Sequence, residues 1–427
     1  MRSLALALLA LLVPAPLMAQ PTAYVGATVY PISGPPIQNG MVVVEDGRIL
    51  EVGPARTDLA GVEQVDVSGK VIMPGLVDTH SHIGEGDGGD RSSALHPEVR
   101  ILDAIDPLSD TFKKARAGGV TTVNIMPGSG HLMSGQTVYL KPRLATAIDD
   151  LVFCDDLTEG ICGGMKMANG TNSIRENPGA FPGTRAKSAA LVRQLFLKAQ
   201  QYRAKREAAE AADEEPPPRD LEMEALLDVL DGRRIVHFHT HRQHDILTAL
   251  RLGEEFGFTP VLHHVSEGWK VADEIAAAGA PASIIVLDSP GGKIEADELY
   301  IITGGVLEEA GVDVAYHTDD YITDSRLFLR SAALGVRGGM SREAALESVT
   351  LAGARMLGLE DRLGSLEAGK DADFIVLSGD PLSTYTHVEQ TYIDGEKVFD
   401  RADAEDRAAA VGGYDVYRGT ATYQHDH

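Results

Sequence analysis

The stretch "MPGLVDTHSHIG", residues 73–84, decides the predicted fold. An apolar run typical of a buried strand ends here in two histidines, His80 and His82, one residue apart. Side chains alternate along a strand with a period of two, so both imidazoles point to the same side. A strand that leaves a hydrophobic interior is therefore predicted to direct two ring nitrogens at one point.

The middle of the chain repeats this kind of strand. The eight predicted strands lie in "VIMPGLVDTHSH", "GVTTVNIM", "TVYLK", "GMKMA", "RIVHFHTH", "TPVLHHV", "ASIIVLD" and "VDVAYHTDD". Amphipathic helices follow several of them, such as residues 245–256 with Gly257 as a stop, and "SREAALESVTLAGARMLG" with Ser341 as its N-cap. Eight such units predict an α/β fold, a (β/α)8 TIM-type barrel; a doubly wound open sheet is the alternative.

Both chain ends have a different pattern. Residues 20–73 and 362–403 contain short β-rich runs separated by turn residues, which predict one small β-sandwich domain built from both ends. The barrel is expected over residues 74–361. It carries a helical insertion at about 186–231, interrupted where the three prolines of "DEEPPPR" cannot continue a helix. Residues 404–427 read as a polar tail.

The first 19 residues have the pattern of a signal peptide, with Arg2 before an apolar run and Ala19 at a plausible cleavage point. We therefore expect a periplasmic or secreted protein; a retained hydrophobic helix is the alternative. The run is too short to span a bilayer, and no later segment is apolar enough to do so. Cys154 and Cys162 could form a disulfide or remain two free thiols.

Charge limits the class of partner. Lys and Arg number 38 against 63 Asp and Glu, a formal net charge of −25. This balance disfavours nucleic acid and anionic lipid surfaces, so we expect a small-molecule substrate. Whether the chain forms a homo-oligomer stays open.

Polar residues concentrate at the C-terminal ends of the predicted strands. In a parallel barrel these ends form one face, where the active site lies. Imidazole and carboxylate are ligands that hold a catalytic zinc-type ion. A single such histidine is more often a satisfied core residue, but five strand ends together favour a metal site. The residues are His80, His82, Lys166, His239, His241, His263, His264, His317 and Asp319.

These motifs resemble those of the amidohydrolase superfamily. The resemblance rests on "PGLVDTHSH", single ligands on later strands and a closing "HTDD", and it covers nearly the whole mature chain. The segments "AGGVTTVNIMPGSG", "GMKMANGTN", "HTHRQHDILTALRL" and "RLGSLEAGKDADFIVL" are similar to the imidazolonepropionase-like branch. The resemblance implies a βα barrel with a small β domain from both chain ends. It also implies one or two divalent metals, with zinc expected, and hydrolysis of a carbon–nitrogen bond.

The resemblance also implies roles for individual residues. It makes metal ligands of His80, His82, Lys166, His239, His264 and Asp319. It selects His264 over the adjacent His263, and His239 over its same-face neighbours. Lys166 would become a carbamate, N6-carboxylysine, that bridges two metals; the alternative is an unmodified lysine that binds a substrate carboxylate beside a single metal. Asp319 would act as general base and then general acid.

Substrate contacts are expected from His241, Arg242, His317, Asn172 and Arg175. A guanidinium there could clamp a substrate carboxylate, although either arginine could equally be a surface ion-pair partner. The predicted function is hydrolysis of an amide, peptide or cyclic amide bond through metal-activated water in an exported enzyme. The alternatives are a lactone or ester hydrolase, and a non-catalytic periplasmic metal- or solute-binding protein. A binding protein would need the histidines but not Asp319 or Lys166, so the presence of both favours an enzyme.

Overall fold

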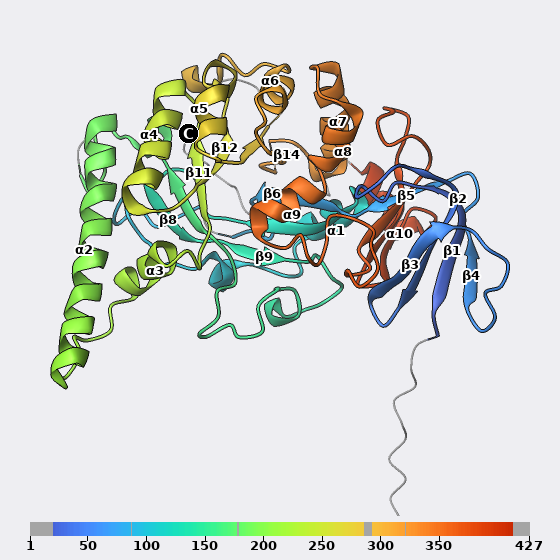
Figure 1. Cartoon of the computed structure of the whole chain (residues 1–427), viewed down its shortest axis with the longest axis horizontal. Helices are drawn as coiled ribbons and strands as arrows, with labels where there is room; N and C mark the ends of the chain where they lie inside the picture. The colour runs from blue at the N-terminus through green and yellow to red at the C-terminus, as the bar shows by residue number, and fades with distance from the viewer. Residues whose placement is uncertain (1–19, 87, 177–178, 286–292, 321, 413–427) are drawn as a thin grey trace, which may run out of the picture.

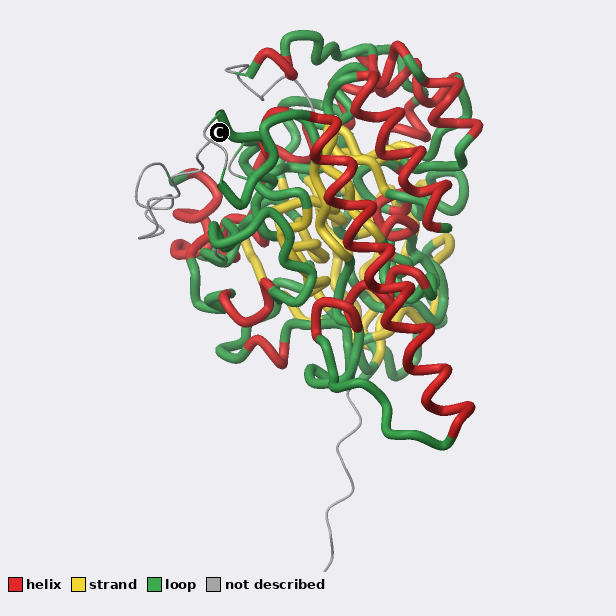
Figure 2. Tube along the Cα trace, turned by 90° about the vertical axis from the view of Figure 1, so that its left-hand side faces the viewer, coloured by secondary structure: helices red, strands yellow, loops and turns green. Residues whose placement is uncertain are grey.

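The computed structural model describes residues 20–86, 88–176, 179–285, 293–320 and 322–412. The chain has mixed α/β content, with strands in the interior and helices and loops around them (Figure 2). The predicted signal peptide, residues 1–19, and residues 413–427 of the predicted tail lie outside the described residues.

Strands from the two ends of the chain form one eight-stranded sheet. Its order is β17-β16-β15-β5-β1-β2-β3, with β4 paired to β1. Met73 of β5 lies opposite Ile375 of β15, so this pairing joins the first and last parts of the chain. The second layer of a sandwich stays a prediction. The strands are β1 (Thr22–Val29), β2 (Ile37–Glu45), β3 (Arg48–Pro54), β4 (Glu63–Asp66), β5 (Val71–Pro74), β15 (Phe374–Leu377), β16 (Val388–Ile393) and β17 (Glu396–Asp400).

The middle of the chain forms two further sheets. One has the order β14-β13-β12-β11-β10-β8 with β10 to β14 parallel, and the other has the order β6-β7-β9 with β6 and β7 parallel. Closure of these sheets into a (β/α)8 barrel stays a prediction, as do the predicted domain boundaries. The strands are β6 (Leu76–Ser81), β7 (Val120–Ile125), β8 (Met133–Gln136), β9 (Val138–Leu140), β10 (Met165–Ala168), β11 (Val236–Thr240), β12 (Val261–His264), β13 (Ala282–Ile284) and β14 (Val314–Tyr316).

The predicted first strand is in fact two strands, which break at Gly75. β5 belongs to the sheet of the chain ends, whereas β6 pairs with β7. A Cβ on Gly75 would lie 2.1 Å from Oγ1 of Thr121, so only glycine allows this close passage between the two sheets.

Ten α-helices are assigned within the described residues. The predicted helix at residues 245–256 is the second part of α4, which ends at Gly257 in the left-handed conformation (φ +80°). Ser341 caps α8 as expected, but the long helix predicted after it is divided into α8 and α9. Ser348 and Thr350 donate hydroxyl hydrogen bonds to backbone carbonyls at this break. The helices are α1 (Asp110–Ala117), α2 (Arg185–Ala212), α3 (Leu221–Leu230), α4 (Gln243–Phe256), α5 (Ala272–Ala277), α6 (Thr303–Glu309), α7 (Phe328–Arg337), α8 (Arg342–Glu347), α9 (Leu351–Leu357) and α10 (Ala404–Val411).

The stretch predicted as a helical insertion holds α2 and α3, which are separated at the "DEEPPPR" segment. In Figure 1, α2 lies at the opposite side of the molecule from β1 to β4. The predicted polar tail begins with a helix, α10, which Asp403 caps by accepting from two backbone N–H groups. No helix in the described part of the chain has both the length and the apolar character that a membrane span requires.

One disulfide and one buried ion cluster connect separate segments of the chain. Cys154 and Cys162 form a disulfide, which resolves the alternative that the sequence left open. Lys141, which follows β9, is fully buried and its Nζ lies 2.7 Å from Asp371, 2.9 Å from Asp373 and 2.5 Å from Asp394. This cluster ties the middle sheets to the sheet of the chain ends.

Candidate active site

The ends of β6, β10 and β14 bring four predicted site residues together. His80 and His82 come from the end of β6, and their Nε2 atoms lie 3.5 and 3.1 Å from Oδ1 of Asp319, which follows β14. Lys166 on β10 places its Nζ 3.1 Å from Nε2 of His80. The first-strand histidine pair therefore points toward one spot, which it shares with a carboxylate and an amine.

Asp78 fixes the end of β14 against β6. Its Oδ1 accepts hydrogen bonds from the backbone N–H of Thr318 (3.0 Å) and of His80 (3.3 Å), and Thr318 Oγ1 donates to Oδ2. The N–H of Asp319 in turn donates to the carbonyl of His80 at 2.8 Å. Burial raises the pKa of Asp78 to about 7 despite the hydrogen bonds from Thr318. The backbone of Asp319, at φ +50°, is held beside the two histidines by this contact.

His239, His241 and His264 form a second group, from β11, the residue after it and the end of β12. Each offers a ring nitrogen within 4.8 Å of the others. The rings of His241 and His264 stack, with centroids 4.9 Å apart. Both nitrogens of His239 and Nε2 of His264 are buried, with no hydrogen-bond partner among the described residues. Buried polar atoms are almost always paired, so a lone pair offered by each of these rings fits a metal ion.

Lys166 lies beside His80 of the first group, in an unusual environment for an amine. It is fully buried, and its Nζ contacts Nε2 of His80 and, at 2.8 Å, the sulfur of Met126. No carboxylate within the described ranges forms an ion pair with it. Burial lowers the pKa of Lys166 to about 7, so the neutral amine is accessible at neutral pH.

The titrating groups have the charge states that metal ligands need. Burial lowers the pKa of His80, His239 and His264, which keeps the rings neutral. Burial raises the pKa of Asp319, but its interactions with the nearby His82 outweigh this effect, and the pKa stays below its usual range. Neutral imidazoles beside an ionised carboxylate are the donor set of a divalent cation site.

The residues predicted to contact substrate lie in different places. His241 is part of the second group. His317 is fully buried and contacts this group. Its Nδ1 lies 2.7 Å from Oγ of Ser283, and its Nε2 lies 3.2 Å from Nδ1 of His264. Both nitrogens of His317 therefore face protein groups. Arg242 precedes α4 and is half-buried, and its Nε has no hydrogen-bond partner among the described residues.

Arg175 and Asn172 are not brought to the imidazoles by any contact that the structure shows. The guanidinium of Arg175 donates to the carbonyls of Asn172 (2.6 Å), Ile174 (3.1 Å) and Gly130 (3.0 Å). It also lies over the ring of Phe181. These contacts hold two loops together and leave little of the guanidinium for a substrate.

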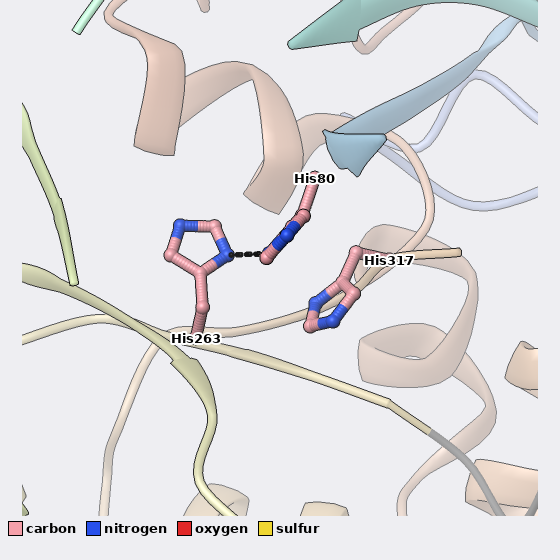
Figure 3. A group of neighbouring side chains, drawn as sticks. All are labelled: His80, His263 and His317. Carbon is pink, nitrogen blue, oxygen red and sulfur yellow. Dashed lines mark hydrogen bonds between the residues drawn. The ribbon is translucent and has the colours of Figure 1, made fainter. Parts of the chain in front are cut away.

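Sequence reasoning passed over three residues that the structure connects to this site. His263 and His237 lie beside the predicted ligands, and the resemblance set them aside. Both are fully buried and hydrogen-bonded to each other, and His263 contacts His80 (Figure 3). Tyr139 lies on β9, and its hydroxyl is hydrogen-bonded to Nε2 of His237. No sequence motif indicated Tyr139 as a site residue, because this contact depends on how separate strands pack.

Comparisons with known proteins identify the family of the chain. The sequence profile described as "Amidohydrolase family" matches residues 197–399. The amidohydrolase tasK of Hapsidospora irregularis is 30% identical over 84% of this chain, which spans 40% of the length of that protein. An imidazolonepropionase of Rhizobium rhizogenes is 28% identical over 83% of this chain and 90% of its own.

A solved structure is also similar over its whole length. The amidohydrolase from Thermotoga maritima MSB8 is 35% identical, with a TM-score of 0.83, over 89% of this chain and 100% of its own. The family predicted from the strand-end motifs is confirmed. This chain belongs to the amidohydrolase family.

Proposed function

We propose that this protein is an exported, metal-dependent amidohydrolase that hydrolyses an amide, peptide or cyclic amide bond. The observation that carries the proposal is the convergence of His80, His82 and Asp319 beside the buried, unpaired nitrogens of His239 and His264. The relatives' names, which include a deaminase of Symbiobacterium thermophilum, support hydrolysis of a carbon–nitrogen bond. We also propose that the middle sheets close into a (β/α)8 barrel.

The proposed metal is zinc, in one or two sites. His80, His82 and Asp319 would hold one ion, and His239 and His264 would hold the other. A divalent ion of this type polarises a carbonyl and lowers the pKa of bound water. Lys166 would bridge the sites as a carbamate, because its buried, neutral amine is the form that reacts with carbon dioxide. An ammonium has no lone pair and could not take this place.

Two residues prepare the site for proton transfer. His82 donates from Nδ1 to the carbonyl of Met126 at 2.7 Å, which leaves the lone pair on Nε2 directed at the site. Asp319 is ionised at neutral pH and can accept the proton of the attacking water. The same carboxyl then returns the proton to the leaving nitrogen. Arg242, half-buried beside the second histidine group, is the proposed contact for a substrate carboxylate.

The first test is hydrolysis by protein purified without a histidine tag and reconstituted with zinc and bicarbonate. The panel contains dipeptides, N-acyl amino acids, cyclic amides and lactones. We expect at least one amide substrate to be cleaved, with the activity abolished by dipicolinic acid and restored by zinc. Cleavage of lactones alone would favour the ester-hydrolase alternative. Zinc bound without turnover of any substrate would favour a binding protein and contradict the proposal.

The role of Asp319 has a matched control at the other end of β14. Asp313 precedes β14, whereas Asp319 follows it, and Asp313 is ion-paired with Arg355. We expect Asp319→Asn to lower turnover by about 10²- to 10⁴-fold, as for loss of a general acid–base group. Elemental mass spectrometry should find its zinc retained. Asp313→Asn should keep wild-type turnover, and an Asp319→Asn protein with full activity would exclude the role.

Export is tested separately. Cells that express the full chain are fractionated, and the N-terminus of the mature protein is determined by mass spectrometry. We expect the periplasmic protein to begin at residue 20. A cytoplasmic protein that keeps residues 1–19 would contradict the proposed signal peptide.

A further inference from the structure

A cavity of about 420 Å³ lies between α2 and α4, two helices that lie side by side in Figure 1. Phe238 of β11 forms part of its inner wall. Because side chains alternate along a strand, Phe238 points away from the side of β11 that carries His237 and His239. The cavity is therefore separate from the candidate active site.

Small side chains leave this space between the two helices. Further along both helices, Phe196 of α2 stacks on Phe256 of α4 with ring centroids 4.8 Å apart, so large side chains fill the contact there. The volume of the cavity lies within the range of about 300–1,000 Å³ that is typical of small-molecule pockets. The small residues that line it are Ala186, Ser188 and Ala189 of α2 and Thr248 of α4.

Two ion pairs hold the helices at this spacing. The Nε of Arg185 in α2 lies 3.0 and 2.9 Å from the two carboxylate oxygens of Asp245 in α4. Arg193 of α2 lies 2.6 Å from Glu255 of α4. The protein's own contacts therefore fix the distance between the helices, and the cavity does not require a ligand in order to form.

Arg251 is the cation that these pairs leave available. It lines the cavity from α4 with an exposed side chain, and it donates one hydrogen bond, at 2.8 Å, to Oγ1 of Thr248. No carboxylate in the described part of the chain forms an ion pair with Arg251. A guanidinium with free N–H groups binds a carboxylate through two parallel hydrogen bonds.

The cavity offers no matching partner for a ligand ammonium. Asp245 is the one carboxylate among the described residues that line the cavity, and Arg185 contacts both of its oxygens. The inner wall is apolar and buried, so a hydrocarbon chain placed there is removed from water. The apolar residues of this wall are Leu132, Val192, Phe238 and Leu252.

We propose that this cavity binds a medium-chain fatty carboxylate, with the carboxylate on Arg251 and the alkyl chain between α2 and α4. The site gives the inserted helix α2 a role of its own, because α2 forms one wall of the pocket. The inference goes beyond the proposed function and depends on neither a metal nor catalysis.

The direct test is calorimetric titration of metal-free protein with octanoate. The protein is first treated with dipicolinic acid and dialysed, so that no metal can hold the carboxylate. We expect one octanoate to bind per chain. Octylammonium and α-aminooctanoate should bind at least about tenfold more weakly, because each carries an ammonium that finds no partner. No saturable binding of octanoate, or equal binding of the three ligands, would overturn the proposal.

The contact with the head group is tested by Arg251→Gln, which should weaken octanoate binding by about tenfold. Arg407→Gln is the matched control, because Arg407 is also exposed but belongs to α10, which lies far from α2 in Figure 1. The Arg407→Gln protein should keep wild-type affinity. Equal affinity of the two variants would exclude Arg251 as the anchor and contradict the proposal.

The place of the alkyl chain is tested by Ala189→Phe, which puts a ring into the cavity and should abolish octanoate binding. Ala204→Phe adds the same ring at an exposed position of α2 outside the cavity and should leave binding unchanged. Thermal unfolding without ligand shows whether each variant folds, and the exposed Arg251→Gln tests the site even if Ala189→Phe does not fold. Equal affinity of two folded phenylalanine variants would place octanoate elsewhere and refute the proposal.

Discussion

Replacement of Lys141 by methionine removes the positive charge at the centre of a buried cluster while keeping an unbranched side chain only one atom shorter. Lys141 contacts Asp371, Asp373 and Asp394, and it has no exposed surface. Breaking a buried ion pair by removing one partner costs about 3–5 kcal/mol, because the other charge stays buried without compensation.

The contacts that remain place the expected loss at the lower end of that range. Asp371 keeps ion pairs with Arg48 and Arg362, and Asp394 keeps one with Arg143. Asp373, whose side chain is only 2% exposed, loses its single ion-pair partner. One carboxylate is therefore left uncompensated, and we expect a loss of about 3 kcal/mol in the free energy of unfolding.

The assay is urea unfolding at pH 7, followed by circular dichroism. Lys113→Met is the control, since the Lys113 side chain is 47% exposed and its ammonium pairs with Asp110, and an exposed pair contributes about 0–1 kcal/mol. Asp373→Asn combined with Lys141→Met should recover part of the loss, because the uncompensated charge is then absent. If the Lys141→Met protein loses no more stability than the Lys113→Met protein, or the double variant recovers nothing, the reasoning is refuted.

Three further predictions concern the ion cluster, the disulfide and the site. Burial raises the pKa of Asp373 to about 6, so the stability contributed by its protonated form is present below about pH 4 and lost as the pH rises through 6. In urea unfolding from pH 4 to 7, the free energy of unfolding of Asp373→Asn should therefore rise relative to that of wild type. The disulfide from Cys154 to Cys162 closes a short loop, and replacing both by serine should cost about 2.5 kcal/mol by the chain-entropy relation. Dithiothreitol should destabilise the wild type alone. Asp78→Asn should lower turnover about tenfold or more with zinc content unchanged, because Asp319 loses its fixed position; wild-type kinetics would exclude this role.

The sequence predicted those features that a single segment encodes. His80 and His82 were placed on one side by strand alternation, and the structure directs both at Asp319. Gly257 ends α4, and the proline segment separates α2 from α3, because each of these residues acts on its own backbone. Histidine groups that could hold a metal were likewise indicated, since the residue types at the strand ends are few and specific.

Features that depend on packing between segments were not predictable. The break at Gly75 exists because Thr121 of another strand passes close to it. The partners of His237 and His263 depend on the register of β11 and β12, in which His237 pairs with Val261 and His239 with His263. Spacing alone left open which of the neighbouring histidines are ligands, and the resemblance to the family set these two aside. The structure instead gives them partners of their own.

The sheet shared by both chain ends also sets an order of events during synthesis. β5 is complete when residue 74 is made, but its partner β15 begins only at residue 374. At the usual rate of about 5–20 residues per second, the edge of β5 waits roughly 15–60 s before it can pair. An unpaired strand edge is a template for aggregation, so any chain that stops before residue 374 keeps this edge open permanently. Ribosome stalling or a premature stop late in the gene should therefore produce insoluble protein rather than a shortened, folded one.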